Sequence, residues 1–148
     1  MEAVNQAIEP EFLSRALATG VKLRIGQMNR SEQAGVVLEI GRYEINVEEQ
    51  GGIVTILKQD ISYLSSPSPL ITPPAASEPV PPPSGIKPNI QQEFLEKAIR
   101  ERHHLTLFLI TGQRVKATIE AFDNFTLLVR DGERQHLFYK HAITTINR

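Results

Sequence analysis

Cysteine is absent from the 148-residue sequence. Its absence excludes disulfide frameworks, thiolate nucleophiles, cysteine-ligated zinc and iron–sulfur clusters. No uninterrupted apolar run approaches the roughly 18–20 residues that a membrane span needs. The first twelve residues also lack the basic and apolar regions of a secretory signal. We therefore expect a soluble cytoplasmic protein with no membrane association.

Proline is scarce outside one segment, since nine of the ten prolines lie between Pro67 and Pro88. Such a run has few amide donors and restricted backbone angles, so it cannot join the interior of a helix or sheet. We expect a semi-extended linker over residues 67–88, spanning at most about 75 Å at ~3.1 Å per residue. A plain spacer is the simpler interpretation, and a recognition site for a proline-binding domain is the alternative.

The linker separates two segments, 1–66 and 89–148, that repeat one another. Phe94-Leu95 follows Phe12-Leu13 by 82 positions, and the same offset aligns further residues if one local shift is allowed near Glu39 and Glu120. The further matches are Ala16 with Ala98, Leu23 with Leu105, Tyr43 with Phe125, Val47 with Val129, Lys58 with Lys140 and Ile61 with Ile143. We infer one fold present twice.

Each copy starts with a helical pattern. Residues 91–102 place Phe94, Leu95, Ala98 and Ile99 on one helical face, and residues 9–20 do the same before ending at a glycine. Strand-like runs follow, separated by turn signals at Thr111-Gly112 and Asp131-Gly132. In the second copy these runs cover 105–110, 114–122, 125–130, 134–139 and 142–146. The pattern predicts a mainly β protein in which a short helix precedes a bent five-stranded sheet, twice.

The size of each copy argues for assembly. A unit of this length buries only about 60% of the surface that its unfolded chain exposes, so it is marginally stable alone. A partly open five-stranded sheet also leaves edge strands without partners. Copies that join edge to edge in a closed ring solve both problems. We expect a ring-forming homo-oligomer.

The second segment resembles Hfq, the RNA-chaperone branch of the bacterial Sm-like family, over residues 91–147. The resemblance is carried by QxxFL before RER, by TGxRVxxxIEAFDNFTLLV and by the terminal FYKHAITTI. The first segment resembles the same fold more loosely. The resemblance implies an N-terminal helix, a bent five-stranded antiparallel sheet and six Sm folds in a ring. Two folds per chain then imply a trimer with a pseudo-hexameric ring, and a hexamer of two stacked rings is the competing arrangement.

The resemblance also implies two RNA-binding faces and a rim. On the proximal face, U-rich single-stranded RNA would contact Gln91, Phe125, Lys140 and His141, supported by Asp123 and Tyr139. The chemistry agrees, because an exposed aromatic ring stacks on a base and the lysine, histidine and glutamine side chains offer donors to uracil oxygens. On pattern alone, Phe125 and Tyr139 also fit core or interface packing, and Lys140 and His141 fit a solvated strand end.

The distal face, which binds A-rich RNA in the family, would use Phe108, Thr111, Gly112, Gln113 and Arg114. Here the sequence departs from the family pattern: Gln113 replaces an apolar residue, Lys116 a glutamine and Ala117 a glycine, so adenine specificity is open. The rim would consist of Arg100 and Arg102, with Ile99 where an arginine is frequent. Two cations in place of three should weaken the attraction for phosphate.

Charge distinguishes the two segments. Residues 1–66 hold six Lys and Arg against nine Asp and Glu, a net charge of −3, whereas residues 89–148 hold nine against seven, a net of +2. Tyr-Lys-His of the second segment is replaced by Leu57-Lys58-Gln59 in the first. We expect the first segment to be a structural repeat that completes the ring, although Tyr43 and Lys58 keep the parts of a residual stacking site.

Neither a metal site, a cofactor nor a catalytic centre is expected. The four histidines lack a carboxylate at ligand spacing, and there is no glycine-rich phosphate loop or nucleophile–base frame. Two functions remain open. The favoured one is an RNA-binding post-transcriptional regulator that acts through the second segment. The alternative is a ring-shaped scaffold that engages a partner protein through the acidic first segment or the proline-rich linker.

Overall fold

The computed structural model describes residues 8–71, 97–123 and 125–147. Two units follow each other along the chain. The first unit has the elements α1 Ile8–Thr19, β1 Lys22–Gln27, β2 Glu32–Ile40, β3 Glu44–Glu49, β4 Gly52–Leu57, the 3-10 turn η2 Lys58–Asp60 and β5 Ile61–Ser66. The second unit has β6 His104–Leu109, β7 Arg114–Phe122, β8 Thr126–Asp131, β9 Arg134–Tyr139, the 3-10 turn η3 Lys140–Ala142 and β10 Ile143–Asn147.

The expected mainly β fold, with a helix ahead of an antiparallel sheet, is confirmed for the first unit. Helix α1 ends where expected, at Gly20, which has a φ of +68° and donates its N–H to the carbonyl of Ala16. In the second unit residues 97–100 are helical, and the earlier part of the helix expected over 91–102 lies outside the described residues.

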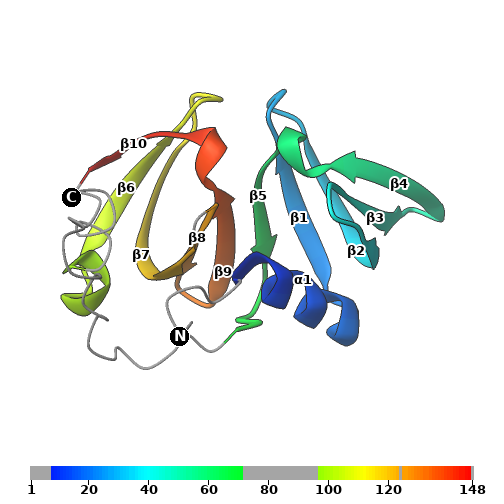
Figure 1. Ribbon diagram of the computed structural model, residues 1–148, viewed down its shortest axis with the longest axis horizontal. Helices are drawn as coiled ribbons and strands as arrows, with labels where there is room; N and C mark the ends of the chain where they lie inside the picture. The colour runs from blue at the N-terminus through cyan, green and yellow to red at the C-terminus, as the bar shows by residue number, and fades with distance from the viewer. Residues whose placement is uncertain (1–7, 72–96, 124, 148) are drawn as a thin grey trace, which may run out of the picture.

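The strands of both units join in one antiparallel sheet of ten (Figure 1). The order is β10-β6-β7-β8-β9-β5-β1-β2-β3-β4, so the two units meet where β5 pairs with β9. Leu64 lies opposite Leu137 and Ser65 opposite His136 in this pairing. We call this edge-to-edge contact the intrachain joint. It leaves β4 and β10 as the two edges of the sheet.

The two units share one register at a constant offset of 82 residues. A bulge lies between Val37 and Glu39 in the first unit and between Ile119 and Ala121 in the second. The local shift expected near Glu39 and Glu120 is therefore wrong. The similarity of two glutamates suggested it, but inward-facing residues on both sides of each bulge set the register, and both units contain the same bulge.

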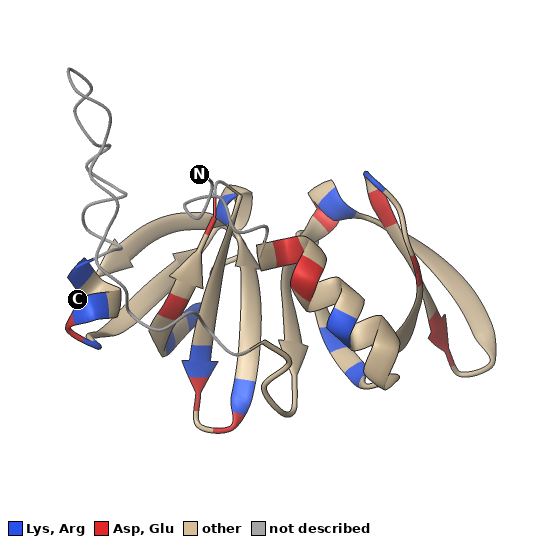
Figure 2. Cartoon of the chain, turned by 60° about the horizontal axis from the view of Figure 1, so that its bottom comes forward, with Lys and Arg blue, Asp and Glu red and all other residues tan. Residues whose placement is uncertain are grey.

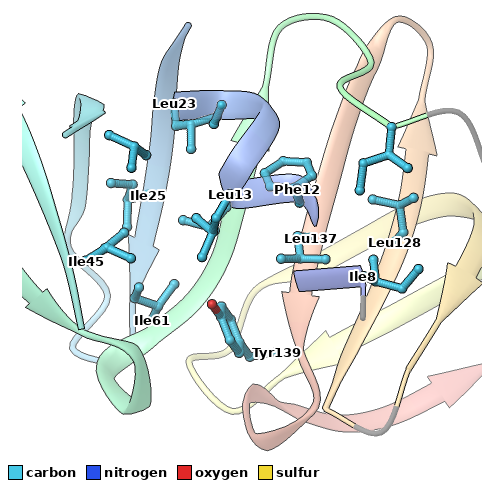
Figure 3. Close-up of a cluster of buried hydrophobic side chains, with 14 of the residues drawn as sticks. Ile8, Phe12, Leu13, Leu23, Ile25, Ile45, Ile61, Leu128, Leu137 and Tyr139 are labelled. Atoms are coloured by element: carbon cyan, nitrogen blue, oxygen red, sulfur yellow. The ribbon is translucent and has the colours of Figure 1, made fainter. Parts of the chain in front are cut away.

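Helix α1 packs on both units at once (Figure 3). Ile8, Phe12, Leu13 and Ala16 are at most 1% exposed. Their cluster contains the inward side chains of the first unit and, from the second unit, Ala121, Leu128, Leu137 and Tyr139. Truncating a buried phenylalanine such as Phe12 typically costs about 3–5 kcal/mol. Because its apolar face is shared, α1 fixes how the two units sit at the intrachain joint.

The start of the expected linker is packed rather than free. Leu70 and Ile71 lie in the cluster under α1, and Ile71 is only 2% exposed. Buried Gln135 of β9 accepts hydrogen bonds from their main-chain N–H groups, at 2.8 and 3.1 Å, and donates to the carbonyl of Ile71 at 2.9 Å. A plain spacer is thus the wrong description for Leu70 and Ile71. Residues 72–88 of the linker lie outside the described residues.

Candidate functional site

Each unit presents an exposed aromatic ring beside a lysine. Phe125, just before β8, is 74% exposed, and its carbonyl accepts a hydrogen bond of 2.8 Å from the main-chain N–H of Lys140. In the first unit Tyr43 is 67% exposed, and its carbonyl accepts the N–H of Lys58 at 2.9 Å. We call these the second aromatic–lysine pair and the first aromatic–lysine pair. The same backbone bond builds both, because a 3-10 turn begins at each lysine.

The lysine of the second pair is half-buried, and its Nζ lies 5.4 Å from the centre of the Phe122 ring. Burial lowers the pKa of Lys140, and the charge of Asp123 opposes that change. Among the described residues no carboxylate comes within ion-pair distance of its ammonium. The ammonium of Lys140 therefore packs on the half-buried ring of Phe122, and its backbone is bonded to that of the exposed Phe125.

His141 belongs to the same turn and is exposed. Its Nε2 lies 2.9 Å from the carbonyl oxygen of Ile61 in the first unit, so in the tautomer protonated at Nε2 it donates across the intrachain joint. Its ring stacks on that of Tyr139 with centres 5.4 Å apart. One ring edge is thus held by the joint, while the exposed part of the ring is accessible to a ligand.

Asp123 holds two segments of backbone in place. One carboxylate oxygen accepts from the N–H groups of Phe125 and Thr126, at 2.8 and 2.6 Å. The other accepts from the N–H groups of Ile8 and Glu9 at the start of α1, at 3.0 and 3.4 Å. Asp123 therefore caps a helix of the other unit and fixes the turn that presents Phe125.

Tyr139 is 5% exposed, and its hydroxyl donates a hydrogen bond of 2.5 Å to the carboxylate of Glu9. Burial, followed by the charge of Glu9, raises the pKa of this tyrosine far above its usual range. Asp123 and Tyr139 thus hold neighbouring groups in place, and their supporting role in RNA binding stays a prediction. Gln91, the remaining proximal candidate, lies outside the described residues.

A cleft of about 500 Å³ opens on the other side of the intrachain joint. Side chains alternate along β9, so His136 and Phe138 point away from α1 while Leu137 and Tyr139 point toward it. The lining combines three cations and one carboxylate with aromatic and polar groups: Arg24, Tyr63, Ser65, Gln113, Arg114, Val115, Lys116, Asp131, His136 and Phe138. Both units contribute to it.

Two of the residues expected on the distal face, Gln113 and Arg114, line this cleft. The guanidinium carbon of Arg114 lies 6.0 Å from the centre of the Phe108 ring. Gly112 belongs to the turn before Arg114 and has a φ of +98°. Thr111 is 6% exposed and is not a lining residue. The structure thus brings Gln113 and Arg114 together at the joint and keeps the other three outside the cleft.

The sequence reasoning missed Tyr63, whose ring occupies space beside Gly26 in the cleft. A Cβ built on Gly26 would lie 2.1 Å from a ring carbon of Tyr63, so only glycine leaves room for the ring. The hydroxyl donates to Glu32 at 2.5 Å, and burial raises the pKa of Tyr63 to about 12. Gly26 inside a strand was the available signal, because such a glycine marks close approach.

The two units differ in their balance of charge, since residues 1–66 hold nine acidic against six basic residues. In Figure 2 basic positions lie close together in the helical turn of the second unit near the C-terminus, whereas basic and acidic positions are interspersed on the first unit. The expected rim residues Arg100 and Arg102 are both exposed in this basic region. In the described ranges, no group of three histidine or acidic residues is placed to hold a metal ion. Nor does any described helix have the length and apolar character needed to cross a membrane.

Comparison with known proteins finds relatives of the second unit. The family model described as "Hfq protein" matches residues 90–148. The RNA-binding protein Hfq of Bacillus subtilis is 43% identical over 61 residues, which are 40% of this chain and 84% of that protein. Its counterpart from Carboxydothermus hydrogenoformans is 43% identical over 58 residues, 39% of this chain and 68% of that protein.

A solved structure of the pleiotropic translational regulator Hfq is 35% identical, with a TM-score of 0.40; the match covers 40% of this chain and all of that one. The matched region contains the second aromatic–lysine pair, and it covers 68% and 84% of the two curated relatives at 43% identity. This chain therefore belongs to the Hfq family.

Proposed function

We propose that the protein is an RNA chaperone and post-transcriptional regulator that binds U-rich single-stranded RNA through its second unit. The observation that carries the proposal is the second aromatic–lysine pair, in which the ring of Phe125 is 74% exposed and Lys140 has no ion-pair partner among the described residues. Relatives named as RNA-binding proteins support it. We further propose a cytoplasmic binding protein without catalytic activity.

The chemistry of the pair favours uracil. A base stacked on Phe125 gains roughly 1–3 kcal/mol. The ammonium of Lys140 and the imidazole of His141 are donors, and uracil presents carbonyl acceptors to them. Asp123 would support this site by fixing the turn of Phe125, and Tyr139 by stacking on the ring of His141. Gln91 remains part of the proposal as a further reader of the base edge.

We propose that three chains close into a ring of six units, with residues 1–66 and 89–148 as the two Sm-like domains and 67–88 as the linker. The intrachain joint supports this arrangement, since β5 and β9 pair edge to edge within one chain. Applying the offset of 82 residues to that pairing gives β10 of one chain on β4 of the next. Its register is Thr145 opposite Ile56, Ile146 opposite Thr55 and Asn147 opposite Val54.

The proposed joint between chains is more polar than the intrachain joint. Where the second unit has Ala121, Leu128 and Leu137 under α1, the first unit has a hydrogen-bonded chain of Glu39, Asn46 and Thr55. Fewer apolar side chains are then buried between chains, so this joint is the weaker of the two. Dilution should separate the ring into single chains and leave each intrachain joint closed.

The cysteine-free sequence makes the ring directly testable. The variant Val54→Cys with Asn147→Cys places one thiol on each edge at opposed positions, where Cα atoms about 4.5–5.5 Å apart suit a disulfide. Oxidation should give a covalent product that stops at three chains. Ile53→Cys with Asn147→Cys, one residue out of register, is the matched control and should react far less. A ladder of longer products would indicate an open filament, and absence of selective linkage would overturn the ring.

RNA binding is tested by fluorescence anisotropy with labelled oligo-uridine and oligo-adenosine. Phe125→Ala should weaken oligo-uridine binding by roughly tenfold or more, from the lost stacking, and Lys140→Ala should weaken it similarly. Tyr43→Ala and Lys58→Ala, the same changes in the first unit, are the matched controls and should change it little. Binding that is blind to sequence, with no loss in either second-unit variant, would instead favour the scaffold function.

The cleft lined by Arg24, Arg114 and Lys116 supports a second RNA contact on the distal face. Its cations suit phosphates, but Gln113 and Lys116 replace the residues usual in the family, so we propose no strict adenine preference there. Arg114→Ala should weaken oligo-adenosine binding and leave oligo-uridine binding nearly unchanged. Equal loss for both oligonucleotides would show that the two faces are not separate sites.

A further inference from the structure

The two aromatic–lysine pairs differ in the contacts of the lysine ammonium. The ammonium of Lys58 lies 3.4 Å from the carboxylate of Glu9, and the two side chains are only 16% and 17% exposed. The same carboxylate accepts the hydroxyl of Tyr139 from the second unit. No comparable carboxylate is ion-paired with Lys140 in the described part of the chain. The lysine of the first pair is therefore already neutralised by the protein itself.

Glu9 cannot easily swing away from this position. It lies in the first turn of α1, and its own N–H and that of Ile8 donate to Asp123 across the joint. Its carboxylate has one partner in each unit, Lys58 and Tyr139. The buried apolar face of α1 fixes the backbone beneath it. Displacing Glu9 would leave a half-buried carboxylate without its partners, which is costly.

We propose that Glu9 closes the first aromatic–lysine pair to RNA, so that each chain keeps one uridine site in place of two. This inference rests on the proposed function. A uracil oxygen or a phosphate that approached Lys58 would have to replace the carboxylate of Glu9. A phosphate would also meet the negative charge of Glu9 itself. The exposed ring of Tyr43 keeps the guanidinium of Arg42, 5.4 Å from its centre, but the ammonium of Lys58 is no longer available to a bound nucleotide.

The substitution Glu9→Gln removes the charge and keeps an acceptor for the hydroxyl of Tyr139. It is tested in a Lys140→Ala background, in which the second pair is disabled. We expect it to tighten oligo-uridine binding about tenfold, the size of one restored charge-assisted contact. Adding Lys58→Ala should abolish that gain. With Lys140 intact, titration should show the number of oligonucleotide sites per chain rising from one to two.

Glu11→Gln is the matched control. Glu11 lies on the same turn of α1 and is exposed, with the guanidinium of Arg15 3.7 Å away. Its loss changes the net charge by the same amount, so a general electrostatic effect would appear equally in both variants. Thermal unfolding of each variant checks the fold. Glu9→Asp has a shorter side chain, so its charge lies farther from Lys58. This second variant should tighten oligo-uridine binding by less than Glu9→Gln does.

The outcomes separate the two proposals. If the unmodified protein binds oligo-uridine through Lys140 and Glu9→Gln adds neither affinity nor a site, the inference about Glu9 is wrong and the proposed function stands. A gain that survives Lys58→Ala, or that Glu11→Gln reproduces, also overturns it. If the unmodified protein does not bind oligo-uridine, the proposed function itself fails.

Discussion

The hydroxyl of Tyr139 donates to the carboxylate of Glu9, a residue 130 positions earlier in the chain, and so joins the two units. The ring of Tyr139 belongs to the buried cluster packed on α1, which also contains Leu137 and Ile61 (Figure 3). It makes the joint dependent on a tyrosine that stays protonated. That dependence has a measurable consequence at alkaline pH.

Alkali should destabilise the protein through this tyrosine. The pKa of Tyr139 is raised in the folded protein, whereas an unfolded tyrosine loses its proton near pH 10. The contribution of Tyr139 to the free energy of unfolding is therefore constant below pH 10. Above pH 10 it falls by up to about 1.4 kcal/mol per pH unit. Urea unfolding of the native protein and Tyr139→Phe at pH 8 to 11 measures this. The variant should lose less stability with rising pH, and equal slopes would contradict the prediction.

Removing the cap at the start of α1 should weaken the joint. Asp123→Ala deletes acceptors for the N–H groups of Ile8, Phe125 and Thr126 together, and we expect a loss of about 2–3 kcal/mol in unfolding free energy. Asp123→Asn keeps an acceptor and should cost clearly less. Urea denaturation followed by circular dichroism measures both. If the alanine variant were as stable as the native protein, the capping role would be wrong.

The hydrogen bonds from Leu70 and Ile71 to Gln135 predict that replacing this glutamine lowers the stability of the protein. Gln135→Ala leaves the buried N–H groups of Leu70 and Ile71 without an acceptor, which should cost about 2 kcal/mol. Ile53, its equivalent in the first unit, is 71% exposed, and Ile53→Ala should change stability by no more than about 0.5 kcal/mol. Comparable losses in the two variants would show that the hydrogen bonds of Gln135 to residues 70 and 71 contribute little to stability.

Local patterns predicted the strands well. The runs 114–122 and 134–139 coincide with β7 and β9, because alternating apolar side chains and flanking turns define both ends. The turn glycines Gly112 and Gly132 have the positive φ that such turns require. Phe125 and Lys140 were singled out by the resemblance to Hfq and not by the strand pattern, on which they also fit core packing and a solvated strand end.

Contacts between distant residues were not predictable in this way. Glu9 reads as an ordinary acidic residue in the first turn of a helix, and only the pairing of β5 with β9 brings it to Tyr139. The buried role of Gln135 depends likewise on where residues 70 and 71 return to the sheet. The cleft around Tyr63 exists only because two units meet, so neither unit's sequence pattern contains it.

Native mass spectrometry of the protein with oligo-uridine tests the central claim most directly, because it reads assembly and RNA binding together. We predict three chains of 16.6 kDa each, about 50 kDa, that carry oligo-uridine. Lys140→Ala should give the same mass without the RNA. A single chain at micromolar concentration, or a trimer whose RNA binding does not depend on Lys140, would contradict the account.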